Sequence, residues 1–113
     1  MTAVKEKDFF THNDDLRFAD LVSVDTSLKG TTILSYRELV EKFGEPIIRC
    51  DDKTIFEWIV VLKRKDLIDI IITIYDWKEN RSPQLIRELE EMEWNVGGHT
   101  LREVRLACEA LGI

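Results

Sequence analysis

Two neighbouring segments alternate regularly between apolar and polar positions. From residue 53 to 63, and again from 68 to 78, large apolar side chains recur at every second residue. A period of two is typical of a β-strand, and the short polar link over residues 64–67 predicts an antiparallel hairpin. Because both faces carry apolar residues, we expect the hairpin to be central, with one face on the helices and part of the other on a partner subunit.

A short amphipathic helix is predicted upstream of this hairpin. Ser35 and Glu38 have the spacing of a capping box, in which each side chain accepts a hydrogen bond from the backbone amide of the other residue. Gly44 followed by Pro46 is the usual order of residues after a helix end. These signals predict a helix over residues 35–43.

Two further helices are predicted nearer the C-terminus. Ser82 as N-cap and Pro83 at the first helical position begin one of them. Thr100 and Glu103 repeat the capping-box spacing and begin the terminal helix. Large apolar residues recur at a helical period in both segments, which predicts one buried face on each.

The remaining elements are short strands and turns. Residues 21–27 alternate and residues 31–34 are rich in β-branched side chains, which predicts two strands joined by a turn at 29–30. Residues 93–96 predict another short strand, and the double glycine at 97–98 predicts a turn.

The predicted order of elements is therefore β-β-α-β-β-α-β-α. It favours an α+β fold, an antiparallel sheet of about five strands with two or three helices packed on one face. We expect one domain over residues 21–113, preceded by an N-terminal arm over residues 1–20. This arm fits no clear period, and it docks through its phenylalanines, folds into a short helix or mediates a subunit contact.

Length, charge and cysteine content exclude several classes of protein. The chain has 113 residues, which suits one domain, and its net charge of −6 disfavours binding to duplex nucleic acid or to anionic membranes. Cys50 and Cys108 lie far apart in the sequence, so they have neither the spacing of a metal site nor that of a disulfide framework. We expect two free thiols in a reducing compartment. Residues 1–8 are too charged for a signal peptide, and the apolar stretch 67–75 is too short to span a bilayer. We therefore expect a cytoplasmic protein.

The sequence offers no catalytic constellation. His12 and His99 are the only histidines, and neither has a partner at the spacing of a metal site. A phosphate-binding Gly-x-x-x-x-Gly-Lys loop is absent from the sequence. The glutamates between residues 88 and 93 are most simply a solvated helix face. We expect no catalytic residue, no metal site and no cofactor.

The binding signals are stronger, and the first is aromatic. Tyr75 and Trp77 lie two residues apart on one predicted strand face, Asp76 points the other way and Lys78 follows. Planar rings beside a cation suit a nucleobase and its phosphate. The alternative is that the two rings cap the core or fill an interface, because aromatic residues on strands are common packing residues.

The second signal is the double glycine before the terminal helix. Paired glycines at a helix start let backbone amides approach an anion without a Cβ in the way. The alternative is a tight turn with no ligand. Trp94, on the strand before it, packs in the core or shields a pocket, and Arg49 and Lys53 are candidate phosphate partners.

Four blocks of residues, in this order and spacing, resemble a family of small viral proteins, mainly of bacteriophages. They are Phe-Gly-Glu-Pro at 43–46, Phe-Glu-Trp at 56–58, Ile-Tyr-Asp-Trp-Lys at 74–78 and Trp-Asn-Val-Gly-Gly-His at 94–99. The resemblance covers about residues 28–112. The two later blocks are the more specific ones, and the Phe-Gly-Glu-Pro helix end is less so.

The family that the chain resembles is that of the phage anti-Thoeris sponges, which sequester cyclic ADP-ribose signals made by TIR-domain immune enzymes; some members also hold cyclic oligonucleotides. The resemblance implies a viral counter-defence protein in the host cytoplasm, a homo-oligomer that buries a small nucleotide between subunits without cleaving it. The matched blocks 75–78 and 94–100, with nearby arginines as phosphate partners, then form the site. The predicted ligand-binding residues are Arg49, Tyr75, Trp77, Lys78, Trp94, Asn95, Gly97, Gly98, His99, Thr100, Arg102 and Arg105.

The chain departs from the family at its N-terminal arm and at an acidic insert over residues 79–93, and an acidic segment disfavours a neighbouring phosphate.

An alternative function is an acidic inhibitor that mimics nucleic acid and docks on a basic host defence enzyme, which the net charge of −6 favours. A third, an enzyme that cleaves such a nucleotide, is weakened by the missing acid–base residues.

Overall fold

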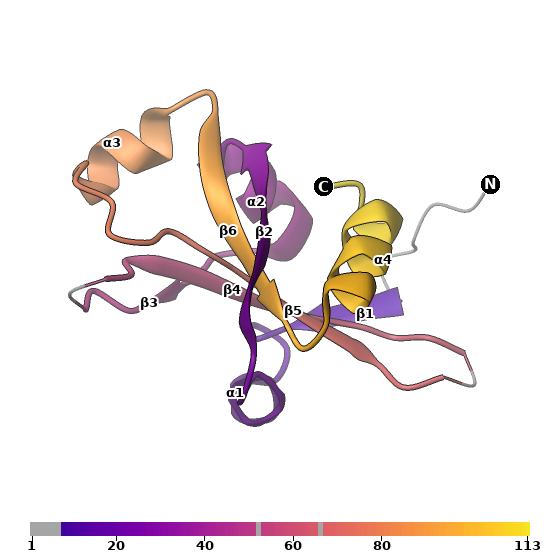
Figure 1. Ribbon diagram of the computed structural model, residues 1–113. Helices are drawn as coiled ribbons and strands as arrows, with labels where there is room; N and C mark the ends of the chain where they lie inside the picture. The colour runs from indigo at the N-terminus through magenta and orange to yellow at the C-terminus, as the bar shows by residue number, and fades with distance from the viewer. Residues whose placement is uncertain (1–7, 52, 66) are drawn as a thin grey trace.

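A six-stranded antiparallel sheet is the centre of the computed structural model, which describes residues 8–51, 53–65 and 67–113 (Figure 1). The strands are β1 (Phe9–Thr11), β2 (Ser27–Leu34), β3 (Ile47–Ile48), β4 (Phe56–Leu62), β5 (Ile70–Tyr75) and β6 (Met92–Gly98). Their order is β1-β4-β5-β6-β2, and β3 pairs with β4 as β1 does. The α+β class with an antiparallel sheet is therefore confirmed.

The predicted hairpin is formed by β4 and β5. The two strands pair antiparallel from Glu57 opposite Tyr75 to Leu62 opposite Ile70. Each has a further strand on its other side, so the hairpin is central, as the apolar residues on both faces predicted.

Three helices pack on one face of the sheet: α2 (Tyr36–Phe43), α3 (Pro83–Glu88) and α4 (Leu101–Leu111). The capping box of α2 is present, because the Ser35 hydroxyl accepts from the Glu38 amide at 3.0 Å and the Glu38 carboxylate accepts from the Ser35 amide at 3.0 Å. Ser82 and Thr100 cap the other two helices as predicted. Each helix thus begins where a side chain satisfies an otherwise unpaired amide.

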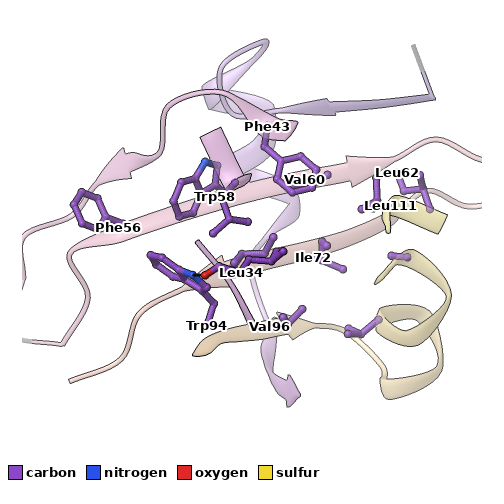
Figure 2. Close-up of a cluster of buried hydrophobic side chains, with 14 of the residues drawn as sticks. Leu34, Phe43, Phe56, Trp58, Val60, Leu62, Ile72, Trp94, Val96 and Leu111 are labelled. Atoms are coloured by element: carbon purple, nitrogen blue, oxygen red, sulfur yellow. Dashed lines mark hydrogen bonds between the residues drawn. The ribbon is translucent and has the colours of Figure 1, made fainter. Parts of the chain in front are cut away.

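Two tryptophans lie at the centre of the core between this helix layer and the sheet (Figure 2). The rings of Trp58 and Trp94 meet edge to face, with centroids 5.3 Å apart, and neither side chain is exposed. Their indole N–H groups donate to the carbonyl oxygens of Gly44 at 2.8 Å and Leu34 at 3.0 Å. Both rings therefore bury apolar area without leaving a polar group unpaired.

The opposite face of the sheet carries a fourth helix, α1 (Leu16–Val22). The Asp15 carboxylate accepts from the Phe18 amide at 3.0 Å and caps the helix start. Phe18 packs on Phe10, whose strand neighbour Val61 faces away from the core formed by α2, α3 and α4. In Figure 1, α1 lies on the far side of the sheet from α2 and α4.

One strand prediction and one turn prediction in this part of the chain are wrong. Residues 21–27 do not form a strand, because α1 runs to Val22 and a turn with Asp25 at φ +67° follows. Residues 29–30 do not form a turn, because β2 continues through them with a bulge between Leu28 and Gly30. Lys29 is one extra residue in the strand and forms a bulge. Lys29 and Gly30 have the composition of a turn, although β2 pairs with β6 on both sides of the bulge.

The N-terminal arm predicted over residues 1–20 joins the sheet where it is described. Residues 1–7 lie outside the described residues, Phe9–Thr11 pairs with β4 and α1 begins at Leu16. His12 is buried between them: its Nε2 lies 2.7 Å from the Glu45 carbonyl oxygen and its Nδ1 accepts from the Ile59 amide at 3.3 Å. None of the helices described is both long and apolar enough to cross a bilayer.

Candidate functional site

A polar hollow of about 430 Å³ opens on the sheet face opposite α2, α3 and α4. Its floor is formed by alternate residues of β4 and β5, and its walls are the α1–β2 connection and the segment between β3 and β4. The lining residues are Thr26, Ser27, Arg49, Asp51, Thr54, Glu57, Thr73, Tyr75 and Trp77. Small-ligand pockets span about 300–1,000 Å³, so the hollow is large enough for a nucleotide-sized ligand.

One wall of the hollow is aromatic, at the end of β5. The rings of Tyr75 and Trp77 meet edge to face, with centroids 6.2 Å apart, and Trp77 is 48% exposed. The cation beside them is Lys53, whose Nζ lies 5.4 Å from the Trp77 ring centroid. Burial raises the pKa of the Tyr75 phenol and the carboxylate of Glu57 raises it further, so this hydroxyl remains a donor at neutral pH.

The position of this aromatic wall is fixed by the residue between the two rings. Asp76 is buried, and its carboxylate accepts from the Ile55 amide at 3.0 Å and from the Phe56 amide at 2.7 Å. The Lys78 amide donates to the Lys53 carbonyl oxygen at 2.7 Å, so the two chain segments stay paired beyond the end of β5. The predicted orientation of Asp76, away from the rings, thus has a structural role.

Arg49 forms the opposite wall and is held by two carboxylates. Its Nε donates to Glu57 at 2.7 Å and its Nη2 donates to Asp20 of α1 at 3.3 Å. Burial alone would lower the pKa of Arg49, but the hydrogen bonds and charges of Glu57 and Asp20 raise it above its ordinary value. With Asp51, the lining carries one cation against two carboxylates, so the hollow is not an anion site in itself.

The double glycine predicted as a turn is part of strand β6, and the turn prediction is wrong. Gly97 pairs with Thr73 and Leu28, and Gly98 pairs with Ile72 and Ser27. A Cβ on Gly97 would lie 2.6 Å from the Thr73 hydroxyl, and a Cβ on Gly98 would overlap the side chain of Val104 in α4. The glycines are therefore explained by close packing within the sheet and against α4 rather than by a loop that accepts an anion.

The other residues predicted on either side of the double glycine do not line the hollow. Trp94 is in the core on the helix side, and Thr100 caps α4. Arg102 and Arg105 are exposed on α4, which packs on the sheet face opposite the hollow. His99 lies with its Nε2 3.2 Å from the Val22 carbonyl oxygen.

Two further predicted residues lie close to the hollow. Asn95 pairs with Tyr75 across β5 and β6 and shares its face, and Lys78 directly follows Trp77. Of the twelve predicted residues, the structure brings only Arg49, Tyr75 and Trp77 into the lining. The aromatic wall and the start of the terminal helix therefore do not form one site.

Six lining residues were not predicted from the sequence: Thr26, Ser27, Asp51, Thr54, Glu57 and Thr73. Thr73 and Glu57 share the face of Tyr75, so counting by two along the hairpin would have found both. The other four lie in or next to connections, and only the folded chain brings them near the rings.

The described residues contain no group of three or more His, Cys, Asp and Glu side chains arranged to hold a metal ion. The chain matches no family model, no curated protein and no solved structure.

Proposed function

We propose that this protein binds a small nucleotide in the hollow on the sheet face that carries α1, and that it holds the nucleotide without cleaving it. The observation that carries the proposal is that Arg49, which is distant in sequence, lines the same hollow of about 430 Å³ as the aromatic pair Tyr75 and Trp77. Lys53 beside the exposed Trp77 ring adds the cation that a phosphorylated ligand needs.

The polarity of the lining suggests how such a ligand would be oriented. Carboxylates only accept hydrogen bonds, so Asp51 and Glu57 suit the hydroxyl groups of a ribose and repel a phosphate. The exposed Trp77 ring suits a base, with stacking worth about 1–3 kcal/mol. The phosphates would then point outward toward Lys53, since the lining of the hollow carries a net negative charge.

The ligand class that best joins these features with the sequence resemblance is a cyclic nucleotide immune signal of the cyclic ADP-ribose type. In this proposal the chain is a viral counter-defence protein that acts in the host cytoplasm by sequestration. Stable retention of the ligand, rather than its turnover, is then the relevant activity.

A second candidate function, an acidic inhibitor of a host defence enzyme, is favoured by one surface feature. Glu88, Glu90, Glu91 and Glu93 are all exposed at and after the end of α3. A partner with a basic nucleic-acid site would meet these carboxylates, whereas the hollow would take no part in the contact.

One experiment distinguishes the two functions and the enzyme alternative. The protein is incubated with cyclic ADP-ribose, or with a cyclic dinucleotide in a parallel sample, separated from free ligand and heat-denatured, and the released ligand is identified by chromatography. Release of intact ligand supports sequestration, and release of altered ligand indicates an enzyme. Retention of neither ligand contradicts sequestration and leaves the inhibitor function.

The matched variants for this experiment are Trp77→Ala and Leu85→Ala. Both remove a large exposed apolar side chain, but Leu85 lies on α3 outside the hollow. We expect Trp77→Ala to lose retention and Leu85→Ala to keep it. If both variants retained the ligand, the hollow would not be its binding site.

A further inference from the structure

Strand β2 is a long free edge of the sheet. The outer edge of β4 is covered by β1 and β3, whereas β2 pairs only with β6 among the residues described. An edge strand presents a row of unpaired backbone N–H and C=O groups that can pair with another chain. At eight residues, β2 is also the longest strand in the described part of the chain.

The composition of β2 differs from that of the rest of the chain. Its sequence, Ser-Leu-Lys-Gly-Thr-Thr-Ile-Leu, holds no carboxylate in a protein of net charge −6, and Lys29 is its one charged residue. The bulge places Lys29 outside the regular pairing, so the stretch from Gly30 to Leu34 pairs with β6 without interruption and is uncharged. Two such strands can therefore meet without bringing like charges together.

The register with β6 sets which side chains of β2 share a face. Thr31 and Ile33 lie opposite Asn95 and Glu93 on the sheet face away from α2, α3 and α4, where Ile33 is 61% exposed. Gly30, Thr32 and Leu34 lie on the helix face, opposite Val96, Trp94 and Met92. The exposed edge thus carries β-branched side chains that favour strand pairing.

We propose that a second copy of this chain pairs antiparallel with β2 over residues 30–34, about a two-fold axis at Thr32. This arrangement places Gly30 opposite Leu34, Thr31 opposite Ile33 and Thr32 opposite its own copy. Every pair then joins residues of the same face, so the two sheets continue into one with both helix layers on the same side. The partner's Thr31 covers the exposed Ile33.

A second copy is the occupant that this edge fits best, because an isologous antiparallel pair needs only that the strand be complementary to itself. The uncharged stretch satisfies that condition, whereas an acidic or basic partner strand would find no charge to pair with. Five residues of strand span about 17 Å, which is short for a permanent interface, so we expect a dimer that dissociates on dilution through the micromolar range.

Cysteine cross-linking tests both the partner and the register. In a chain with Cys50→Ser and Cys108→Ser, Thr32→Cys should form a disulfide-linked dimer under mild oxidation, because directly opposite residues have the Cα separation that a disulfide needs. Thr31→Cys faces Ile33 of the other copy, so it should cross-link far less. Ile48→Cys, on the short strand β3, is the exposed control.

Analytical ultracentrifugation over a range of concentrations supplies the second readout. We expect the unmodified protein to shift from monomer to dimer as its concentration rises, Ile33→Asp to lose the dimer, and Ile48→Asp to keep it. A protein that stays monomeric at every concentration would overturn the proposal. So would cross-linking by Ile48→Cys as efficient as that by Thr32→Cys, or a dimer that survives Ile33→Asp.

Discussion

The buried carboxylate of Asp76 is expected to hold the aromatic wall in place. It accepts hydrogen bonds from the backbone amides of Ile55 and Phe56, with the shortest distance 2.7 Å to the Phe56 amide. A hydrogen bond to a charged group contributes about 1.5–3 kcal/mol, and a buried amide left without a partner costs about 1–3 kcal/mol. Asp76→Ala should therefore lower the free energy of unfolding by about 2–5 kcal/mol, and Asp76→Asn, which keeps one acceptor oxygen, by about 1–3 kcal/mol.

Urea unfolding, followed by circular dichroism, measures this change, and an unaltered slope would show that the unfolded state is the same. The control is Asp69→Asn, whose partner Lys63 lies 3.4 Å away in an exposed pair worth about 0–1 kcal/mol. If Asp76→Ala destabilised the protein no more than Asp69→Asn does, Asp76 would not hold the two segments together. Asp76 would then not be the residue that fixes the position of Trp77.

Three further predictions concern thiol reactivity, acid titration and the double glycine. Cys50 is exposed, whereas burial raises the pKa of Cys108, so iodoacetamide at neutral pH should alkylate Cys50 first, as mass spectrometry can show; equal rates would contradict this. Hydrogen bonds from Arg81 lower the pKa of Glu79 to about 2. The contribution of Glu79 to stability is therefore complete above its ordinary pKa near 4.5 and is lost as the pH falls through about 2. NMR of the carboxyl group should give a titration midpoint near 2, and Arg81→Met should raise it. Gly98→Ala should cost about 1–3 kcal/mol of stability through overlap with α4, and an unchanged melting temperature would contradict the packing explanation.

The elements that the sequence predicted correctly depend on local signals. The capping residues Ser35, Ser82 and Thr100 act within one helical turn, and the alternation in β4 and β5 repeats over six or seven residues. Such signals need no knowledge of distant parts of the chain, because each cap bonds an amide three residues away and the alternation repeats at every second residue. The hairpin and three of the helices could therefore be located before the structure was known.

The features that could not be predicted depend on long-range pairing. Alternation shows that Trp94 and Asn95 point to opposite faces, but only the register between β5 and β6 shows that Asn95 shares the face of Tyr75. Gly97 and Gly98 have the composition of a turn, yet neighbouring strands on both sides keep them extended. The hollow has the same origin, because its walls come from connections far apart in the sequence.

The central claim is that a nucleotide binds against Trp77, and tryptophan fluorescence tests it most directly. Trp58 and Trp94 are fully buried, so Trp77 is the tryptophan that a ligand in the hollow can reach. Titration with cyclic ADP-ribose should produce a saturable change in emission that Trp77→Ala abolishes and Leu85→Ala preserves. A flat titration, or a saturable change that persists in Trp77→Ala, would contradict the account.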